Sequence, residues 1–129
     1  MTQEDKNLLL KDLCARLPYG IKAQYNSELI GKIKVGGIEG YDNNVFFMDD
    51  RYPYYVEELS PYLRPMSSMT EEEQEEFLDL IIPIDRGKAV VEEDNIERYN
   101  EFIYAHHFDN KGLIEKGLSL EAPEGMYND

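Results

Sequence analysis

The region between residues 20 and 63 constrains the fold more than any other part of the chain. Its short apolar or alternating runs are separated by Gly, Asn, Asp and Pro, which is typical of strands joined by turns. The runs are IKAQY, ELIGKIKV, NVFFM and YYVEEL. They predict an antiparallel meander of about four strands, and such a sheet needs one of its faces covered by other elements.

A helix is expected before this region, over residues 3–17. Thr2 followed by Asp5 is an N-cap signal, and apolar side chains then recur at helical spacing until Pro18. The stripe consists of Leu9, Leu10, Leu13, Cys14 and Leu17. We therefore expect Cys14 in the core. As the only cysteine it also excludes an internal disulfide and a zinc site built on several thiolates.

A helical region, residues 70–107, is expected after the strands. Thr70 and Glu73 have the spacing of a capping box, and the acidic first turn suits the positive end of the helix dipole. This helix is expected to run to Pro83 with a buried face of Phe77, Leu78, Ile81 and Ile82. A second apolar stripe predicts another helix from about residue 94 to residue 107.

Two further segments are expected to lack long regular elements. The connector SPYLRPMSSM contains two prolines, which argues against a central strand. Residues 108–129 contain several glycines and a proline, so we expect a turn followed by a surface tail.

The expected architecture is therefore a single α+β domain spanning residues 1–129. It consists of an N-terminal helix, the meander, and two C-terminal helices packed on one face of the sheet. A small, partly open barrel is the alternative. The length of 129 residues fits one core, and the 42% hydrophobic fraction is too high for a disordered chain.

The formal net charge of -14 is unevenly distributed along the chain. Residues 1–69 carry 8 Lys+Arg against 10 Asp+Glu, whereas residues 70–129 carry 5 against 17. Such a surface repels phosphate, which disfavours direct binding of nucleic acid. The polar, acidic start and the lack of a long apolar run predict no signal peptide and no membrane segment, and hence a cytoplasmic location.

His106 and His107, with Asp109 close behind, are the residues that most resemble a chemical site. Neighbouring residues on a helix point about 100° apart, so two adjacent histidines chelate a metal poorly. We expect a helix end here, with Asn110 or Gly112 in the left-handed cap conformation and His107 facing outward. An acid–base site using the three side chains is the alternative. Neither a metal nor a cofactor is expected.

A recognition surface is the other candidate site. Tyrosine has an apolar body and a polar tip, which suits core edges and protein interfaces alike. The candidate residues are Tyr52, Tyr54, Tyr55 and Tyr62 on the strands and Glu72 and Glu76 on the acidic helix. The expected partner is another protein, and the sequence leaves the oligomeric state open.

Three motifs carry a resemblance to a known family. They are LLLKDLCARLPYGIK, SPYLRPMSSMTEEEQEEF and HHFDNKGLIEKGLSLEAPEGMYN. The chain resembles an uncharacterised family of small acidic cytoplasmic proteins of anaerobic gut bacteria, often found beside phage-like or other mobile elements. The resemblance implies a bacterial protein accessory to mobile DNA or to defence against it, and it supplies no catalytic residue.

Three functional hypotheses follow. The leading hypothesis is a non-enzymatic protein-binding or accessory module, because the sequence assembles no complete catalytic constellation. The second is an acidic mimic of nucleic acid that inhibits a DNA-binding enzyme, with the carboxylates of residues 71–101 replacing phosphates. The third is a hydrolase that uses His106 or His107 with Asp109.

Overall fold

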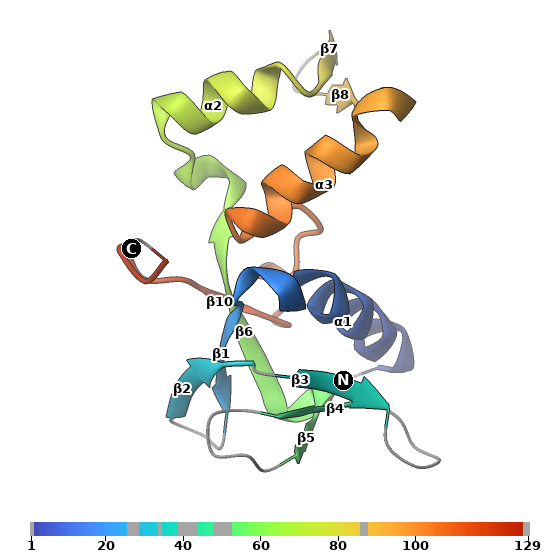
Figure 1. The fold of residues 1–129 in the computed structure, drawn as a ribbon, viewed down its shortest axis with the longest axis vertical. Coiled ribbons are helices and arrows are strands. Elements are labelled where there is room, and N and C mark those ends of the chain that lie inside the picture. Colours follow the sequence, from blue (N-terminus) through green and yellow to red (C-terminus); the bar gives the residue numbers. More distant parts are fainter. Residues whose placement is uncertain are drawn as a thin grey trace.

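The computed structural model describes residues 2–25, 29–33, 35–38, 44–47, 53–85 and 88–127. Over these residues the chain is α+β with a helix at its N-terminus, as the sequence predicts (Figure 1). The expected arrangement of the strands and of the C-terminal helices is wrong in several details.

Helix α1 (Gln3–Arg16) begins where its cap signal predicts. The Thr2 hydroxyl accepts a hydrogen bond from the amide of Asp5 at 3.0 Å. A one-turn 3-10 helix (Leu17–Tyr19) follows and ends at Gly20, whose φ of 76° requires a residue that tolerates the left-handed region. Cys14 is exposed, so its expected place in the core is wrong.

The main sheet is mixed rather than an antiparallel meander. Its strand order is β10-β6-β1-β2, with β9 also paired to β6. Strands β1 and β2, and β1 and β6, are antiparallel, whereas both β9 and β10 run parallel to β6. The strands are β1 (Lys22–Tyr25), β2 (Leu29–Lys32), β6 (Leu59–Pro65), β9 (Phe108–Asp109) and β10 (Leu120–Glu121).

A second, separate sheet contains the expected runs NVFFM and YYVEEL in part, together with a strand over Val35–Ile38 that the sequence did not predict. It is antiparallel in the order β3 (Val35–Ile38), β4 (Asn44–Phe47) and β5 (Pro53–Tyr55). A 3-10 turn (Val56–Glu58) then leads into β6. Buried Ile33 lies between the two sheets in the chain and joins the same core as Phe46 of β4.

The proline-containing connector is the central strand β6, contrary to expectation. Its partners change along its length: Leu59–Pro61 pair with β1, Tyr62 and Leu63 with β10, and Arg64 and Pro65 with β9. Both Pro61 and Pro65 therefore lie at the end of a ladder, where the absent N–H costs least. Strand β6 can occupy the centre because no single neighbour pairs with it throughout.

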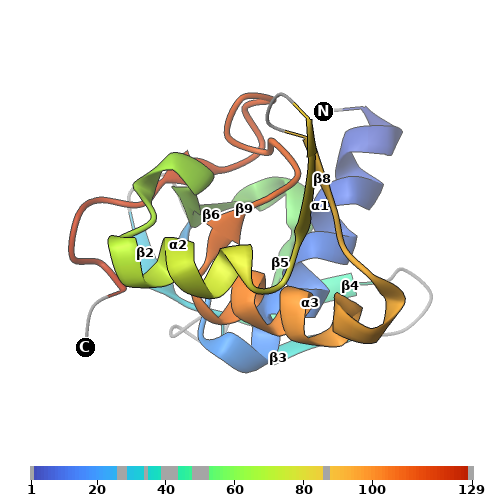
Figure 2. The same ribbon diagram turned by 90° about the horizontal axis from the view of Figure 1, so that it is seen from above.

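The elements between β6 and β9 form a second group, which we call the helical lobe. A 3-10 turn (Met66–Ser68) leads into it, and another (Glu93–Asn95) precedes its last helix. The lobe consists of α2 (Glu71–Leu78), the hairpin β7 (Ile82–Asp85) and β8 (Lys88–Val90), and α3 (Ile96–Ala105). The other described elements form the body. Figures 1 and 2 show α2, the hairpin and α3 together on one side of the body.

Helix α2 has the predicted start and a different end. The capping box is confirmed, because the Glu73 amide donates to the Thr70 hydroxyl and the Thr70 amide donates to the Glu73 carboxylate. The helix stops at Leu78, since Ile82–Asp85 pair with β8 instead of continuing it. Leu78 and Ile82 are 57% and 42% exposed, so their expected burial is wrong.

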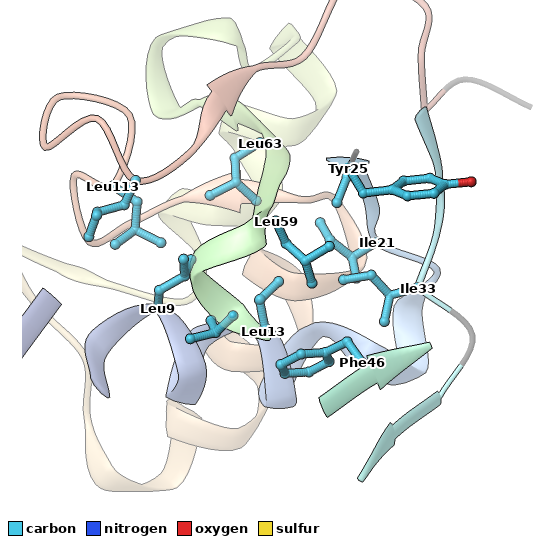
Figure 3. Close-up of a cluster of buried hydrophobic side chains, with 12 residues drawn as sticks. Leu9, Leu13, Ile21, Tyr25, Ile33, Phe46, Leu59, Leu63 and Leu113 are labelled. Carbon is cyan, nitrogen blue, oxygen red and sulfur yellow. The ribbon is translucent and has the colours of Figure 1, made fainter. Parts of the chain in front are cut away.

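The body and the helical lobe have separate cores. Among the residues that the structure describes, twelve buried ones form the body core, in which Leu9 and Leu13 of α1 pack against the strands (Figure 3). The lobe core consists of Leu80, Phe102 and Ile103 from the lobe together with Phe108 of β9, against which they pack. Helix α1 therefore covers the strands, whereas α2 and α3 pack on each other. Helix α3 also contacts β9 and α1, and α2 is joined to β6 by the Arg64–Glu73 ion pair.

Candidate functional site

His106 lies at the C-terminal end of α3 and contacts a carboxylate. Its Nδ1 is 3.0 Å from Oε2 of Glu73, the capping-box residue of α2. Its ring packs against Phe102 and Phe108, with ring centres 4.7 and 6.0 Å away. The imidazole therefore links the two helices of the lobe and is half-buried there.

Glu73 is the centre of this cluster. Arg64 of β6 donates two hydrogen bonds to its carboxylate, at 2.8 and 2.7 Å, and stacks its guanidinium 4.4 Å above the Phe108 ring. The hydrogen bonds from Arg64 lower the pKa of Glu73 to about 2. Glu73 is thus ionised at neutral pH and attaches α2 to the body through β6. The sequence predicted its backbone contact but gave no sign of its ion pair.

His107 has a different environment from its neighbour. It is 7% exposed, so the expectation that it faces outward is wrong. Its ring stacks on Tyr127 of the C-terminal tail, with 3.7 Å between ring centres. Burial lowers the pKa of His107 to about 4, assisted by the positive charges of Arg16, Arg64 and Lys22 and by His106. The imidazole is therefore neutral at physiological pH.

The backbone of His107 has the left-handed conformation that the sequence predicted for Asn110 or Gly112. Its φ of 63° is in the left-handed region, which histidine enters more readily than most residues. Its carbonyl accepts a hydrogen bond of 2.7 Å from the Arg64 amide. Gly112 also has a positive φ, of 71°, as expected. His107 thus ends α3 and directs the chain into β9.

Asp109 organises the backbone that follows it. Its two carboxylate oxygens accept hydrogen bonds from the amides of Leu113 and Ile114, at 2.9 and 3.0 Å. The carboxylate is 8% exposed and caps the turn after β9. His106, His107 and Asp109 therefore have three different sets of partners, and this arrangement does not support the hydrolase hypothesis.

A buried ion pair that the sequence did not reveal lies under the same segment. Arg16 and Asp12 are one helical turn apart on α1, both 0% exposed, with 2.7 Å between Nε and Oδ2. Arg16 also donates to the carbonyl of Phe108 at 2.7 Å, and Lys111 lies 3.2 Å from the other oxygen of Asp12. The only sign of this pair in the sequence was its i, i+4 spacing. Exposed ion pairs on helices have the same spacing, so the spacing alone did not reveal that this pair is buried.

The tyrosines of the candidate surface lie in different environments, and Tyr52 is outside the described residues. Tyr54 is half-buried and packs edge-on against Tyr25, 5.3 Å away. Tyr62 is 9% exposed, and its carbonyl accepts a hydrogen bond from the Tyr127 hydroxyl. Tyr55 is 49% exposed. Among the tyrosines of this surface that the structure describes, Tyr55 thus offers the most surface to a partner.

Glu72 and Glu76 are exposed on α2, together with Glu71 and Glu75.

The end of this helix leads to an apolar surface that sequence reasoning missed. Among the described residues, five large apolar side chains are exposed, and four belong to the helical lobe. We call these four the tip surface: Leu78 (57% exposed), Ile82 (42%), Val90 (45%) and Ile96 (47%).

The tip surface draws its residues from four elements. Leu78 is the last residue of α2 and Ile96 the first of α3. Ile82 and Val90 are register partners in the hairpin, so their side chains share one face of it. In Figure 1 the end of α2, the hairpin and the start of α3 lie at the end of the molecule farthest from β3–β5.

A pocket of about 550 Å³ lies between the end of β6, the start of α2 and the tail. Its polar lining includes Arg64, Thr70, Glu121 and Tyr127. Arg64 and Thr70 are engaged with Glu73, and Tyr127 bonds to the backbone of Lys22 and Tyr62. Most of its polar groups therefore hold the fold together.

Across the described parts of the chain, no cluster of three or more His, Cys, Asp or Glu side chains could hold a metal ion. The helices in those same parts are all too short or too polar to cross a membrane. Comparison with known proteins finds no match: neither a family model, nor a curated protein, nor a solved structure is similar to this chain.

Proposed function

We propose that the protein is a non-enzymatic protein-binding module of the bacterial cytoplasm, and that the tip surface is its binding site. The observation that carries this proposal is the gathering of Leu78, Ile82, Val90 and Ile96, each more than two-fifths exposed, at one end of the helical lobe. Single exposed apolar side chains are ordinary, whereas several large ones at one end of a lobe, two of them paired across a hairpin, favour an interface.

The placement of these residues supports binding over folding. Among the described residues, the lobe supplies Leu80, Phe102 and Ile103 to the lobe core, yet four large apolar side chains of the same lobe remain outside it. Burying a leucine or isoleucine fully is worth about 1.5–3 kcal/mol. A partner that covers the tip surface would recover much of that free energy.

The resemblance to small acidic proteins near mobile elements fits an accessory binding role of this kind. It is the basis for a bacterial, cytoplasmic setting, and the tip surface is the basis for protein binding. The side chains of His106, His107 and Asp109 each contact other residues of the fold, and this favours a binding role over hydrolysis.

The test is affinity capture from a bacterial lysate with quantitative mass spectrometry. The test variant combines Leu78→Ser and Val90→Ser, which removes apolar area from α2 and from β8. The comparison variant is Tyr55→Ser, which probes the alternative tyrosine surface, because Tyr55 is similarly exposed, at 49%, but lies on β5 of the body. We expect specific partners to be lost from the double variant and kept by the comparison variant. Identical partner sets for wild type and double variant would contradict the proposal.

A nucleic-acid mimic is the second candidate, favoured by the exposed carboxylates of Glu71, Glu72, Glu75 and Glu76 on one short helix. In that role α2, rather than the tip surface, would contact a DNA-binding protein. The variant Glu72→Gln with Glu76→Gln distinguishes the two. Loss of captured DNA-binding proteins from this variant, with retention by the Leu78→Ser, Val90→Ser variant, would favour mimicry.

A further inference from the structure

Carboxylates flank the residues of the tip surface along the chain. Asp79 follows Leu78 directly, and Glu97 follows Ile96 directly. Glu92, Glu93 and Asp94 occupy the segment that joins Val90 to Ile96. All five acidic side chains are exposed, and we call them the acidic rim.

The charge of the surrounding chain has the same sign. Residues 71–101 carry 3 Lys+Arg against 12 Asp+Glu, a net charge of -9. The three cations are Arg86 and Lys88 of the hairpin region and Arg98 of α3. A partner that covers the tip surface therefore enters a region of negative potential, which raises its association rate if the partner is basic.

We infer that the partner of the tip surface is a basic amphipathic segment of another protein, with apolar side chains on one face and Lys or Arg beside them. This inference rests on the proposed function and specifies the chemistry of the partner. The apolar face would cover Leu78, Ile82, Val90 and Ile96, and the flanking cations would face the acidic rim.

Charge complementarity selects this occupant over a second copy of the chain. Two tip surfaces brought together would place two acidic rims against each other, and like charges across an interface cost binding free energy. An acidic or a purely apolar segment would leave the rim without a counterion. A basic amphipathic segment satisfies both features of the surface at once.

The probe is a synthetic helical peptide of leucine and lysine with all leucines on one face. Its controls are a peptide of the same composition with the leucines dispersed and a peptide with glutamate in place of lysine. Stopped-flow fluorescence gives association and dissociation rates for the full chain at salt concentrations from about 50 to about 500 mM.

Matched variants separate the rim from general acidity. The rim variant combines Asp79→Asn, Glu92→Gln and Glu97→Gln. The control variant combines Glu4→Gln, Glu115→Gln and Glu124→Gln, which removes three exposed carboxylates from the body. Both variants carry the same net charge, so any difference between them reports position.

The amphipathic Leu/Lys peptide is expected to bind the wild type and neither control peptide to bind as tightly. The rim variant is expected to lower the association rate about tenfold at low salt, and added salt to lower the wild-type rate similarly. The control variant is expected to change the rate less than about twofold. The Leu78→Ser, Val90→Ser variant is expected to raise the dissociation rate.

Three results would overturn the inference. The first is that the peptide with dispersed leucines binds as tightly as the amphipathic peptide, and the second is that the rim and control variants lower the association rate equally. The third is concentration-dependent dimerisation of the wild type that Leu78→Ser abolishes. If lysate partners depend on Leu78 and Val90 but the Leu/Lys peptide fails to bind, the partner chemistry is wrong and the proposed function stands. If those partners are indifferent to Leu78 and Val90, the proposed function itself fails.

Discussion

The body and the helical lobe of this protein use their apolar residues in opposite ways. The body buries twelve residues in one core, and residues 1–69 have nearly balanced charge, with 8 Lys+Arg against 10 Asp+Glu. Among the described residues, the lobe buries Leu80, Phe102 and Ile103 and leaves four large apolar side chains exposed. Those four lie within residues 71–101, which have a net charge of -9. This difference is the basis for our proposal that the body supplies most of the stability and that the lobe supplies the binding surface.

Removing one partner of the buried ion pair in the body is expected to have the largest effect. Asp12→Ala leaves Arg16, 0% exposed, without its carboxylate, which costs about 3–5 kcal/mol of unfolding free energy. Urea unfolding followed by circular dichroism measures this. The control is the double variant Asp12→Leu with Arg16→Met, which we expect to lose less. If the single and double variants lose the same unfolding free energy, the charge of Arg16 is compensated by groups other than Asp12.

The two cores can be compared directly with the same substitution. Leu63→Ala in the dense body core is expected to cost about 4 kcal/mol, and Leu80→Ala in the sparse lobe core about 2 kcal/mol, because a sparse site relaxes more easily around the deletion. Both leucines are nearly fully buried, at 0% and 3% exposure. Equal or larger destabilisation by Leu80→Ala in urea unfolding would contradict the division of roles between body and lobe.

The attachment of the lobe to the body is tested by Glu73→Gln. Glutamine can keep the bond to the Thr70 amide but loses the charge that holds Arg64 and His106. The loss is expected to be about 1–2 kcal/mol, since the pair is partly screened by solvent. Hydrogen exchange should become about tenfold faster in α2 and remain unchanged in β1. Glu72→Gln, on the same helix, is the control, and uniform acceleration in both elements would contradict a local role.

The tail's contact with the body predicts a pH dependence. The pKa of His107 is about 4 in the folded chain and near 6.5 in an unfolded one. Between these values the unfolded chain binds more protons, so the free energy of unfolding is complete above pH 6.5 and falls as pH drops toward 4. We expect a loss of about 1–2 kcal/mol between pH 7 and pH 5 from this residue.

The variant His107→Asn isolates that contribution. Asparagine tolerates the left-handed φ of 63° and does not titrate in this range. Its unfolding free energy should change less between pH 7 and pH 5 than that of the wild type. If the unfolding free energy of His107→Asn changes between pH 7 and pH 5 as much as that of the wild type, the pH dependence comes from other groups. Glu73 is not one of them, because its pKa of about 2 places its effect below pH 4.5.

The sequence predicted the features that depend on neighbouring residues. The caps at Thr2 and Thr70, the start of both helices and the end of α3 near the histidines are set within a few positions of the chain. The exposure of the acidic face of α2 was also predictable, because consecutive glutamates at a helix start favour water.

The remaining features depend on distant residues. Strand β6 is central because two-residue strands from the last part of the chain pair with it, and no local pattern in SPYLRP announces them. The burial of Arg16 depends on the carbonyl of Phe108, 92 positions away. The tip surface was missed because Leu78 and Ile82 fit the buried face of a longer helix, and pairing of Ile82 with Val90 replaced that helix by a hairpin.

The central claim is that the exposed apolar residues of the lobe serve binding and not folding. The most direct measurement is the unfolding free energy of the Leu78→Ser, Val90→Ser variant beside its capture of partners from lysate. We expect stability to change by less than about 1 kcal/mol, as for substitutions at exposed sites, while specific partners are lost. A large loss of stability, or full retention of partners, would contradict the claim.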